Sequence, residues 1–99
     1  MAFPVSHNAE EKQFESRVDG ELAVLTYDQD DGRITFTHTL VPKKIERRGI
    51  GTELVRQGLA HARAEKLQVI PQCPFVAAHI KRTRDGLDLL DANWRQRLE

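Results

Sequence analysis

The sequence predicts an α+β domain, in which an antiparallel meander of strands precedes a β-α-β crossover and a short C-terminal helix. Two observations predict this class: apolar and polar residues alternate in the first part of the chain, and a helical period follows Gly49. With 99 residues, of which 39% are apolar, the chain fits a single domain over residues 1–99. We expect residues 1–11 to be loose.

Three strands are expected in the first part of the chain. Residues 12–18 alternate apolar and charged side chains and favour an edge strand, and Asp19-Gly20 predicts a hairpin turn after it. Residues 21–27 are apolar on both faces, so this strand is expected to be covered on both sides. Residues 33–41 follow a second turn and are rich in Thr and in branched or aromatic side chains.

The third strand carries a histidine among apolar residues. Its period of two places His38 and Leu40 on the same face as Ile34 and Phe36. Because this face is apolar, we interpret His38 first as a core histidine.

A helix, a strand and two further helices are expected in the second half. From Gly49 to about Lys66, apolar residues form one helical stripe, with Glu53 outside it. Leu67–Ile70 is a short apolar run that favours a strand, and the two prolines that follow favour irregular chain. Helices are expected at Phe75–Arg84 and at 88–97.

The net charge is zero, from 15 basic and 15 acidic residues, but the charges are unevenly distributed. Residues 1–32 carry a net charge of −6, whereas residues 43–66 carry +4. The zero balance argues against a generally basic, nucleic-acid-binding surface. Two interpretations of the basic segment remain: an ordinary solvated face, or a site for a phosphate-bearing ligand.

The basic segment contains a glycine turn, Glu46-Arg47-Arg48-Gly49-Ile50-Gly51, which joins a strand to the amphipathic helix. Glycines let the backbone approach a ligand closely, and the free N–H groups that begin a helix bind phosphate well. A Rossmann fingerprint is excluded because Leu54 stands where its third glycine belongs. A Walker loop is excluded because Gly51-Thr52-Glu53 lacks the required Lys-Ser/Thr pair.

This turn resembles the acetyl-CoA motif of the GNAT N-acetyltransferase superfamily, Gln/Arg-x-x-Gly-x-Gly/Ala. Three segments together resemble the minimal GNAT-like N-acetyltransferase subfamily: His38-Thr39-Leu40-Val41-Pro42, Arg48-Gly49-Ile50-Gly51 and Val69-Ile70-Pro71-Gln72-Cys73-Pro74-Phe75-Val76. The resemblance extends from Phe14 to Lys81. It implies a small GNAT-like fold, in which the strand at 33–41 splays from the strand at 67–70.

The resemblance also implies an activity, namely transfer of an acetyl group from acetyl-CoA to a primary amine by direct attack in a ternary complex. The acceptor would be a small molecule or a protein lysine, and the acidic first third of the chain would attract it. The residues predicted to bind the cofactor are Leu40, Val41, Arg47, Arg48, Gly49, Ile50, Gly51 and Thr52. Three residues depart from the family pattern: Glu46 replaces Gln or Arg, Arg47 replaces a frequent glycine, and Leu40 stands where the subfamily often has Glu, a candidate general base.

Three residues are candidates for the chemistry. Cys73 is either a nucleophile that takes the acetyl group or a small buried group that lines the acceptor pocket. His79 stands near the place of a GNAT tyrosine that protonates the departing thiolate; alternatively it is a packing or surface histidine. His38, if it is not a core histidine, accepts the amine proton. Four scattered histidines and one cysteine do not form a zinc pattern, so we expect no metal.

No apolar run approaches the roughly 18 residues needed to cross a bilayer, and the first residues do not resemble a signal peptide. A single cysteine suits a reducing compartment, so we expect a cytoplasmic protein, either a monomer or a weak dimer. Two alternative functions remain: a CoA-binding module without significant catalysis, and, less favoured, a small nucleic-acid-binding domain.

Overall fold

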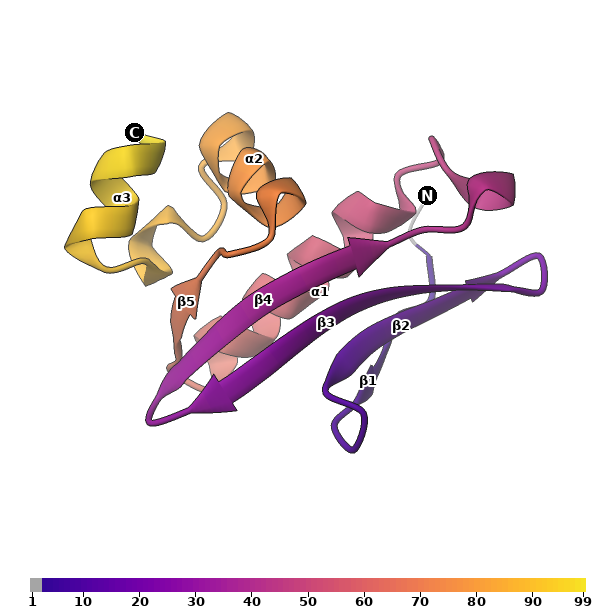
Figure 1. Ribbon diagram of the computed structural model, residues 1–99, viewed down its shortest axis with the longest axis horizontal. Coiled ribbons are helices and arrows are strands. Elements are labelled where there is room, and N and C mark those ends of the chain that lie inside the picture. The colour runs from indigo at the N-terminus through magenta and orange to yellow at the C-terminus, as the bar shows by residue number, and fades with distance from the viewer. Residues whose placement is uncertain (1–2) are drawn as a thin grey trace.

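The computed structural model describes residues 3–99 and contains one five-stranded sheet with helices (Figure 1). The elements, with η for short 3-10 helices, are β1 (Ser6–Asn8), β2 (Gln13–Val18), β3 (Glu21–Asp30), β4 (Arg33–Leu40), η1 (Lys43–Ile45), α1 (Ile50–Ala64), β5 (Gln68–Ile70), α2 (Pro74–Thr83), η2 (Leu87–Leu89) and α3 (Ala92–Leu98). The strand order is β1-β2-β3-β4-β5, antiparallel except for the parallel β4–β5 pair. The predicted meander and β-α-β crossover are therefore confirmed.

The N-terminal segment is more ordered than the sequence predicts. Ser6–Asn8 pairs antiparallel with β2, so the expectation that residues 1–11 are loose is wrong for this stretch. It follows that β2 is an inner strand and β1 the edge, contrary to the edge position predicted for residues 12–18. The pairing is helped by the ring of His7, which stacks on Phe14 with centroids 4.3 Å apart. Residues 1 and 2 lie outside the described residues.

Two Asp-Gly turns connect the long strands. The φ angles are 50° and 79° at Asp19 and Gly20, and 44° and 78° at Asp31 and Gly32. Two consecutive positive φ angles are what a two-residue type I′ hairpin requires, and this turn matches the right-handed twist of the strands. The predicted first turn is confirmed. The second turn, expected over residues 28–32, comprises only Asp31 and Gly32, because β3 continues to Asp30.

A β-bulge in β4 reverses the predicted faces of its last residues. The antiparallel pairing with β3 shifts between Phe36 and His38, which leaves Thr37 as an extra residue. Beyond the bulge, Thr39 shares the core face because it pairs with Leu25, and His38 lies on the opposite face. His38 is exposed, so its interpretation as a core histidine is wrong.

One face of the sheet packs against α1, which lies behind β3 and β4 in Figure 1. Ala23 and Leu25 of β3 are fully buried on this face, whereas Leu22 and Val24 on the other face are half-buried. The prediction that this strand is covered on both sides is therefore wrong.

The helical stripe predicted after Gly49 forms α1, with one exception. Leu54, Val55 and Leu59 are buried as expected. Glu53 is also buried, although its charge places it outside the stripe, because its carboxylate accepts hydrogen bonds from Arg56 Nη1 (3.2 Å) and Gln57 Nε2 (2.9 Å).

The C-terminal part packs two helices beyond β5. As predicted, the chain is irregular between β5 and α2. The helix α2 begins at Pro74 and ends at Thr83, one residue earlier at each end than the predicted Phe75–Arg84. The single helix predicted at 88–97 is instead divided into η2 and α3. Asp91 caps α3, since its Oδ1 accepts a hydrogen bond of 2.8 Å from the backbone N–H of Trp94. Within residues 3–99, no helix has the length and apolar character that crossing a bilayer requires.

Candidate functional site

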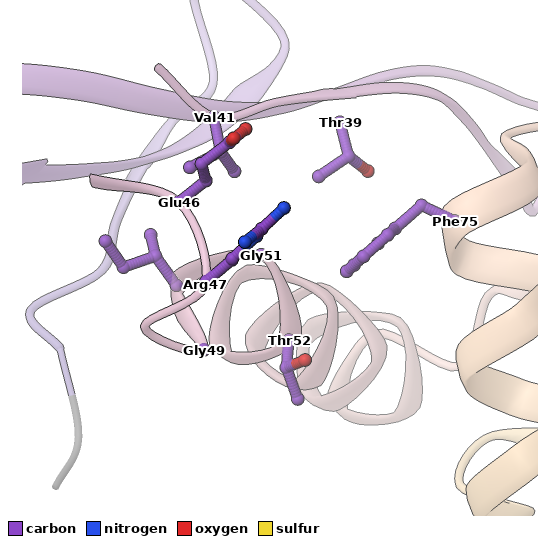
Figure 2. Close-up of a pocket in the computed structure, with 9 residues that line it drawn as sticks. Thr39, Val41, Glu46, Arg47, Gly49, Gly51, Thr52 and Phe75 are labelled. Atoms are coloured by element: carbon purple, nitrogen blue, oxygen red, sulfur yellow. The ribbon is translucent and has the colours of Figure 1, made fainter. Parts of the chain in front are cut away.

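An open cleft of about 460 Å³ lies between the end of β4, the N-terminus of α1 and the start of α2 (Figure 2). Its lining residues are Thr39, Val41, Glu46, Arg47, Gly49, Ile50, Gly51, Thr52 and Phe75. Most of the predicted cofactor-binding turn is therefore in its wall.

The cleft exists because β4 and β5 part. They pair only from Arg33↔Gln68 to Thr35↔Ile70, after which β5 ends and the chain turns towards α2. The last backbone hydrogen bond across the gap runs from the N–H of Cys73 to the Phe36 carbonyl, at 2.9 Å. Beyond this point the edge of β4 faces the cleft rather than a strand, as the predicted splay requires.

The N-terminus of α1 supplies hydrogen-bond donors to the cleft. Gly49 caps the helix with φ 88°, a left-handed conformation that favours glycine, and it makes no side-chain capping bond. The first intrahelical bond runs from the Glu53 N–H to the Gly49 carbonyl. The N–H groups of Ile50, Gly51 and Thr52 precede that bond, so they are free donors at the positive end of the helix dipole.

Two arginines precede these donors and point in different directions. Arg47 has φ 67°, and its side chain extends into the cleft, between Val41 and Glu46 on one side and Phe75 on the other (Figure 2). Arg48 is outside the lining, because its Nη1 donates to Asp19 Oδ2 at 2.7 Å. One guanidinium is therefore inside the cleft and the other is held by the β2–β3 turn.

Gly51 keeps the cleft open beside α2. A Cβ added to Gly51 would lie 3.0 Å from Phe75 Cζ and 3.6 Å from Val41 Cγ2. These contacts would fill the space between the helix terminus, β4 and α2. A larger residue at position 51 would therefore be disfavoured for steric reasons, independent of backbone conformation.

The structure separates the predicted cofactor-binding residues into two groups. Val41, Arg47 and the stretch 49–52 line the cleft, whereas Leu40 and Arg48 do not. Leu40 is 59% exposed on the opposite face of β4, because the bulge reverses the alternation. Three lining residues are missing from the prediction: Thr39, Phe75 and Glu46, the last of which the sequence names only as a departure from the family pattern. The bulge that turns Thr39 inward has no signal in the sequence, whereas Phe75 falls inside the third segment of the resemblance.

Cys73 lies next to the cleft wall without lining it. Its side chain is buried, and its Sγ is 3.3 Å from Thr39 Oγ1. It is also the N-cap of α2, at the positive end of that helix. The thiol thus contacts the cleft through Thr39.

The two candidate histidines lie farther away. His79 is one helical turn beyond Phe75 on α2 and is 3% exposed. Its Nε2 is 3.5 Å from Asp85 Oδ2, and its ring nitrogens have no hydrogen-bond partner among the described residues. His38 lies on the sheet face opposite to Thr39. Neither histidine lines the cleft.

Among residues 3–99, no three His, Cys, Asp or Glu side chains are grouped to hold a metal ion. The family model described as GCN5-related N-acetyl-transferase matches residues 13–89, which include β4, α1, β5 and α2, the elements around the cleft and the gap. A search of curated proteins finds no match to the chain.

Proposed function

Since the chain belongs to the GCN5-related N-acetyltransferase family, we propose that it binds acetyl-CoA in this cleft and transfers the acetyl group to a primary amine. The observation that carries the proposal is the position of Arg47, whose guanidinium extends into a cleft bordered by the free N–H groups of α1. A cation and helix N–H donors together are suited to a pyrophosphate.

The lining residues fit the phosphate part of the cofactor. The N–H groups of residues 50–52 would bind pyrophosphate oxygens, and Arg47 would add charge-assisted hydrogen bonds. The space that a Cβ at Gly51 would fill is available for the ligand. Glu46 opposes binding by its charge, and Arg47 beside it offsets this cost.

The free edge of β4 fits the pantetheine arm. Beyond Phe36 this edge lacks a strand partner among the described residues, so those backbone N–H and C=O groups of residues 37–41 that do not bond to β3 are available to the pantetheine arm. When bound, acetyl-CoA would supply the thioester carbonyl that the amine nitrogen attacks. The chain would contribute mainly proximity and orientation, together with a backbone donor for the carbonyl oxygen.

Cys73 retains two roles in this proposal. Its contact with Thr39 places the thiol beside the cleft, where it either lines the acceptor side or takes the acetyl group first. Direct transfer to the amine is the simpler route, because it needs no activated thiolate. The two routes differ in whether Cys73 becomes acetylated.

The cofactor proposal is tested by calorimetric titration with CoA and by thermal melting with acetyl-CoA. Arg47→Ala is expected to weaken CoA binding about tenfold or more, since it removes a charge-assisted hydrogen bond. Arg33→Ala is the matched control, because it removes the same charge at the opposite end of β4. An absence of any thermal shift at millimolar acetyl-CoA would contradict the proposal. Tight DNA binding that falls steeply with salt would instead favour a nucleic-acid-binding domain.

Catalysis is tested separately, by acetyl-CoA consumption with a panel of small amines and lysine peptides. Binding without turnover would indicate a CoA-binding module. Mass spectrometry after incubation with acetyl-CoA, on the wild type and on Cys73→Ala, separates the two routes. A stable adduct that the variant loses would support the covalent route, and turnover retained by the variant would support direct transfer.

A further inference from the structure

A contact outside the cleft controls one of the two arginines of the glycine turn. Arg48 Nη1 and Asp19 Oδ2 are 2.7 Å apart and join the β2–β3 turn to the loop before α1, across 29 residues of sequence. The side chains are 45% and 65% exposed, so solvent reaches both ends of the ion pair.

The backbone is left-handed at the two positions that flank Arg48, and Asp19 sets the position of the Arg48 guanidinium itself. Arg47 and Gly49, on either side of Arg48, have φ angles of 67° and 88°. The loop thereby turns sharply at both positions, with Arg47 in the cleft and Arg48 outside it. Asp19 is itself fixed by its type I′ turn, where its φ is 50°.

We propose that Asp19 lowers the affinity of the site for CoA by holding Arg48 away from the cleft, and that a bound pyrophosphate takes Arg48 over from Asp19. The inference rests on the proposed function, because it names the ligand of the cleft as a CoA phosphate. A pyrophosphate carries more negative charge than one carboxylate and offers more acceptor oxygens, so it competes well for a guanidinium. An exposed ion pair contributes little to stability, so breaking the Asp19–Arg48 contact costs little free energy.

The same exchange couples the hairpin to the ligand. If Asp19 weakens ligand binding, the bound ligand must weaken the Asp19–Arg48 contact by the same factor, because coupling between two binding events is reciprocal. Amide hydrogen exchange at Gly20 and Glu21 is therefore expected to speed up when CoA is added.

The test is a calorimetric titration with CoA, and in parallel with inorganic pyrophosphate. Asp19→Asn is expected to tighten binding about two- to fivefold, the factor that corresponds to an exposed ion pair. Asp31→Asn is the matched control: it removes the same charge from the other Asp-Gly turn, which makes no contact with Arg48. Arg48→Ala is expected to weaken binding, and adding Asp19→Asn to it should change nothing further.

The outcomes separate this inference from the proposed function. Weaker binding by Asp19→Asn would overturn it, since the ion pair would then support the loop. Equal effects of Asp19→Asn and Asp31→Asn would also overturn it, because only overall charge would matter. If the wild type binds pyrophosphate but not CoA, the proposed function fails while the same variants still test the exchange with pyrophosphate. If it binds neither, both fail.

Discussion

Replacing Gly51 by alanine is expected to weaken CoA binding while leaving the fold stable. The new Cβ would lie 3.0 Å from Phe75 Cζ and 3.6 Å from Val41 Cγ2. Both side chains line the cleft, so the methyl group takes space that the ligand needs. The backbone N–H of residue 51 remains, so the effect is steric and does not come from a lost donor.

Gly51→Ala is expected to change the free energy of unfolding less than it changes the free energy of CoA binding. Alanine is favoured over glycine inside a helix by up to about 1 kcal/mol. The ring of Phe75 is 44% exposed and can turn aside, so the free energy of unfolding should stay within about 1 kcal/mol of the wild type. Against a bound ligand, the extra methyl group costs about 1–3 kcal/mol, which weakens binding about fivefold to 150-fold.

Gly58→Ala is the matched control, two helical turns further along α1. Its Cβ would lie 3.0 Å from Leu25 Cδ2 and 3.0 Å from Phe36 Cε1, and both side chains are fully buried. They cannot turn aside, so a cost of about 1–3 kcal/mol exceeds the helix-propensity gain of about 1 kcal/mol. Each net kcal/mol should lower the melting temperature by about 4–8 °C. Gly58 does not line the cleft, so the CoA affinity should be unchanged.

Urea unfolding and CoA calorimetry on the wild type and both variants are the assays. We expect Gly51→Ala to lose CoA affinity while keeping its stability, and Gly58→Ala to lose stability while keeping its CoA affinity. The reasoning is refuted if Gly51→Ala binds CoA as the wild type does, or if it loses as much stability as Gly58→Ala.

Three further changes test other parts of the structure. Burial, and to a lesser extent the nearby His61, hold the pKa of His7 below its ordinary value of 6.5. The neutral ring therefore contributes stability above pH 6.5, and this contribution is lost as the pH falls. Between about pH 7.5 and 5, the free energy of unfolding in urea should fall less for His7→Phe than for the wild type. Asp91→Ala removes the cap of α3 and should lower stability by about 0.5–2 kcal/mol. Unfolding followed by Trp94 fluorescence should then have its midpoint at a lower urea concentration. Ser16→Ala should raise the free energy of unfolding by up to about 1 kcal/mol, because the buried hydroxyl has no partner among the described residues. A lower free energy of unfolding for the variant, measured in urea, would contradict this.

Local chemistry predicts the frame of this fold well. A few neighbouring residues determine each of three features: the Asp-Gly turn at 19–20, the helical stripe after Gly49 and the break between β5 and α2 at the prolines. The glycine turn likewise predicts the helix terminus that borders the cleft. The family match over residues 13–89 confirms the resemblance drawn from these segments.

The features that sequence missed depend on strand register or on side-chain hydrogen bonds, neither of which apolar periodicity reports. The bulge at Thr37 lies in a strand whose alternation continues without interruption, so only the register with β3 shows that His38 and Leu40 turn outward. Glu53 is buried through hydrogen bonds from Arg56 and Gln57, which a count of apolar positions does not include.

Tertiary contacts also decide the direction of Arg48 and the order of β1. The sequence places Arg48 beside the glycine turn, but Asp19, 29 residues away, holds its guanidinium outside the cleft. The polar strand Ser6–Asn8 has little strand propensity of its own and forms because β2 offers a paired edge and Phe14 a surface for stacking. In both cases the deciding partner lies outside the segment itself, in β2 for His7 and in the β2–β3 turn for Arg48.

The placement of the histidines has a consequence for the pH dependence of the proposed transfer. His38 lies on the outer face of the sheet and the Nε2 of His79 is directed at Asp85, so neither faces the cleft. Next to the edge of β4, the wall offers the Thr39 hydroxyl and, behind it, the Cys73 thiol. If neither a histidine nor the Glu46 carboxylate in the wall accepts the amine proton, the amine must arrive deprotonated. For a lysine-like acceptor with a pKa of about 10.4, kcat/KM should then rise about tenfold per pH unit above neutrality. A plateau near pH 7 that disappears in His38→Ala or His79→Gln would instead assign the proton to that histidine.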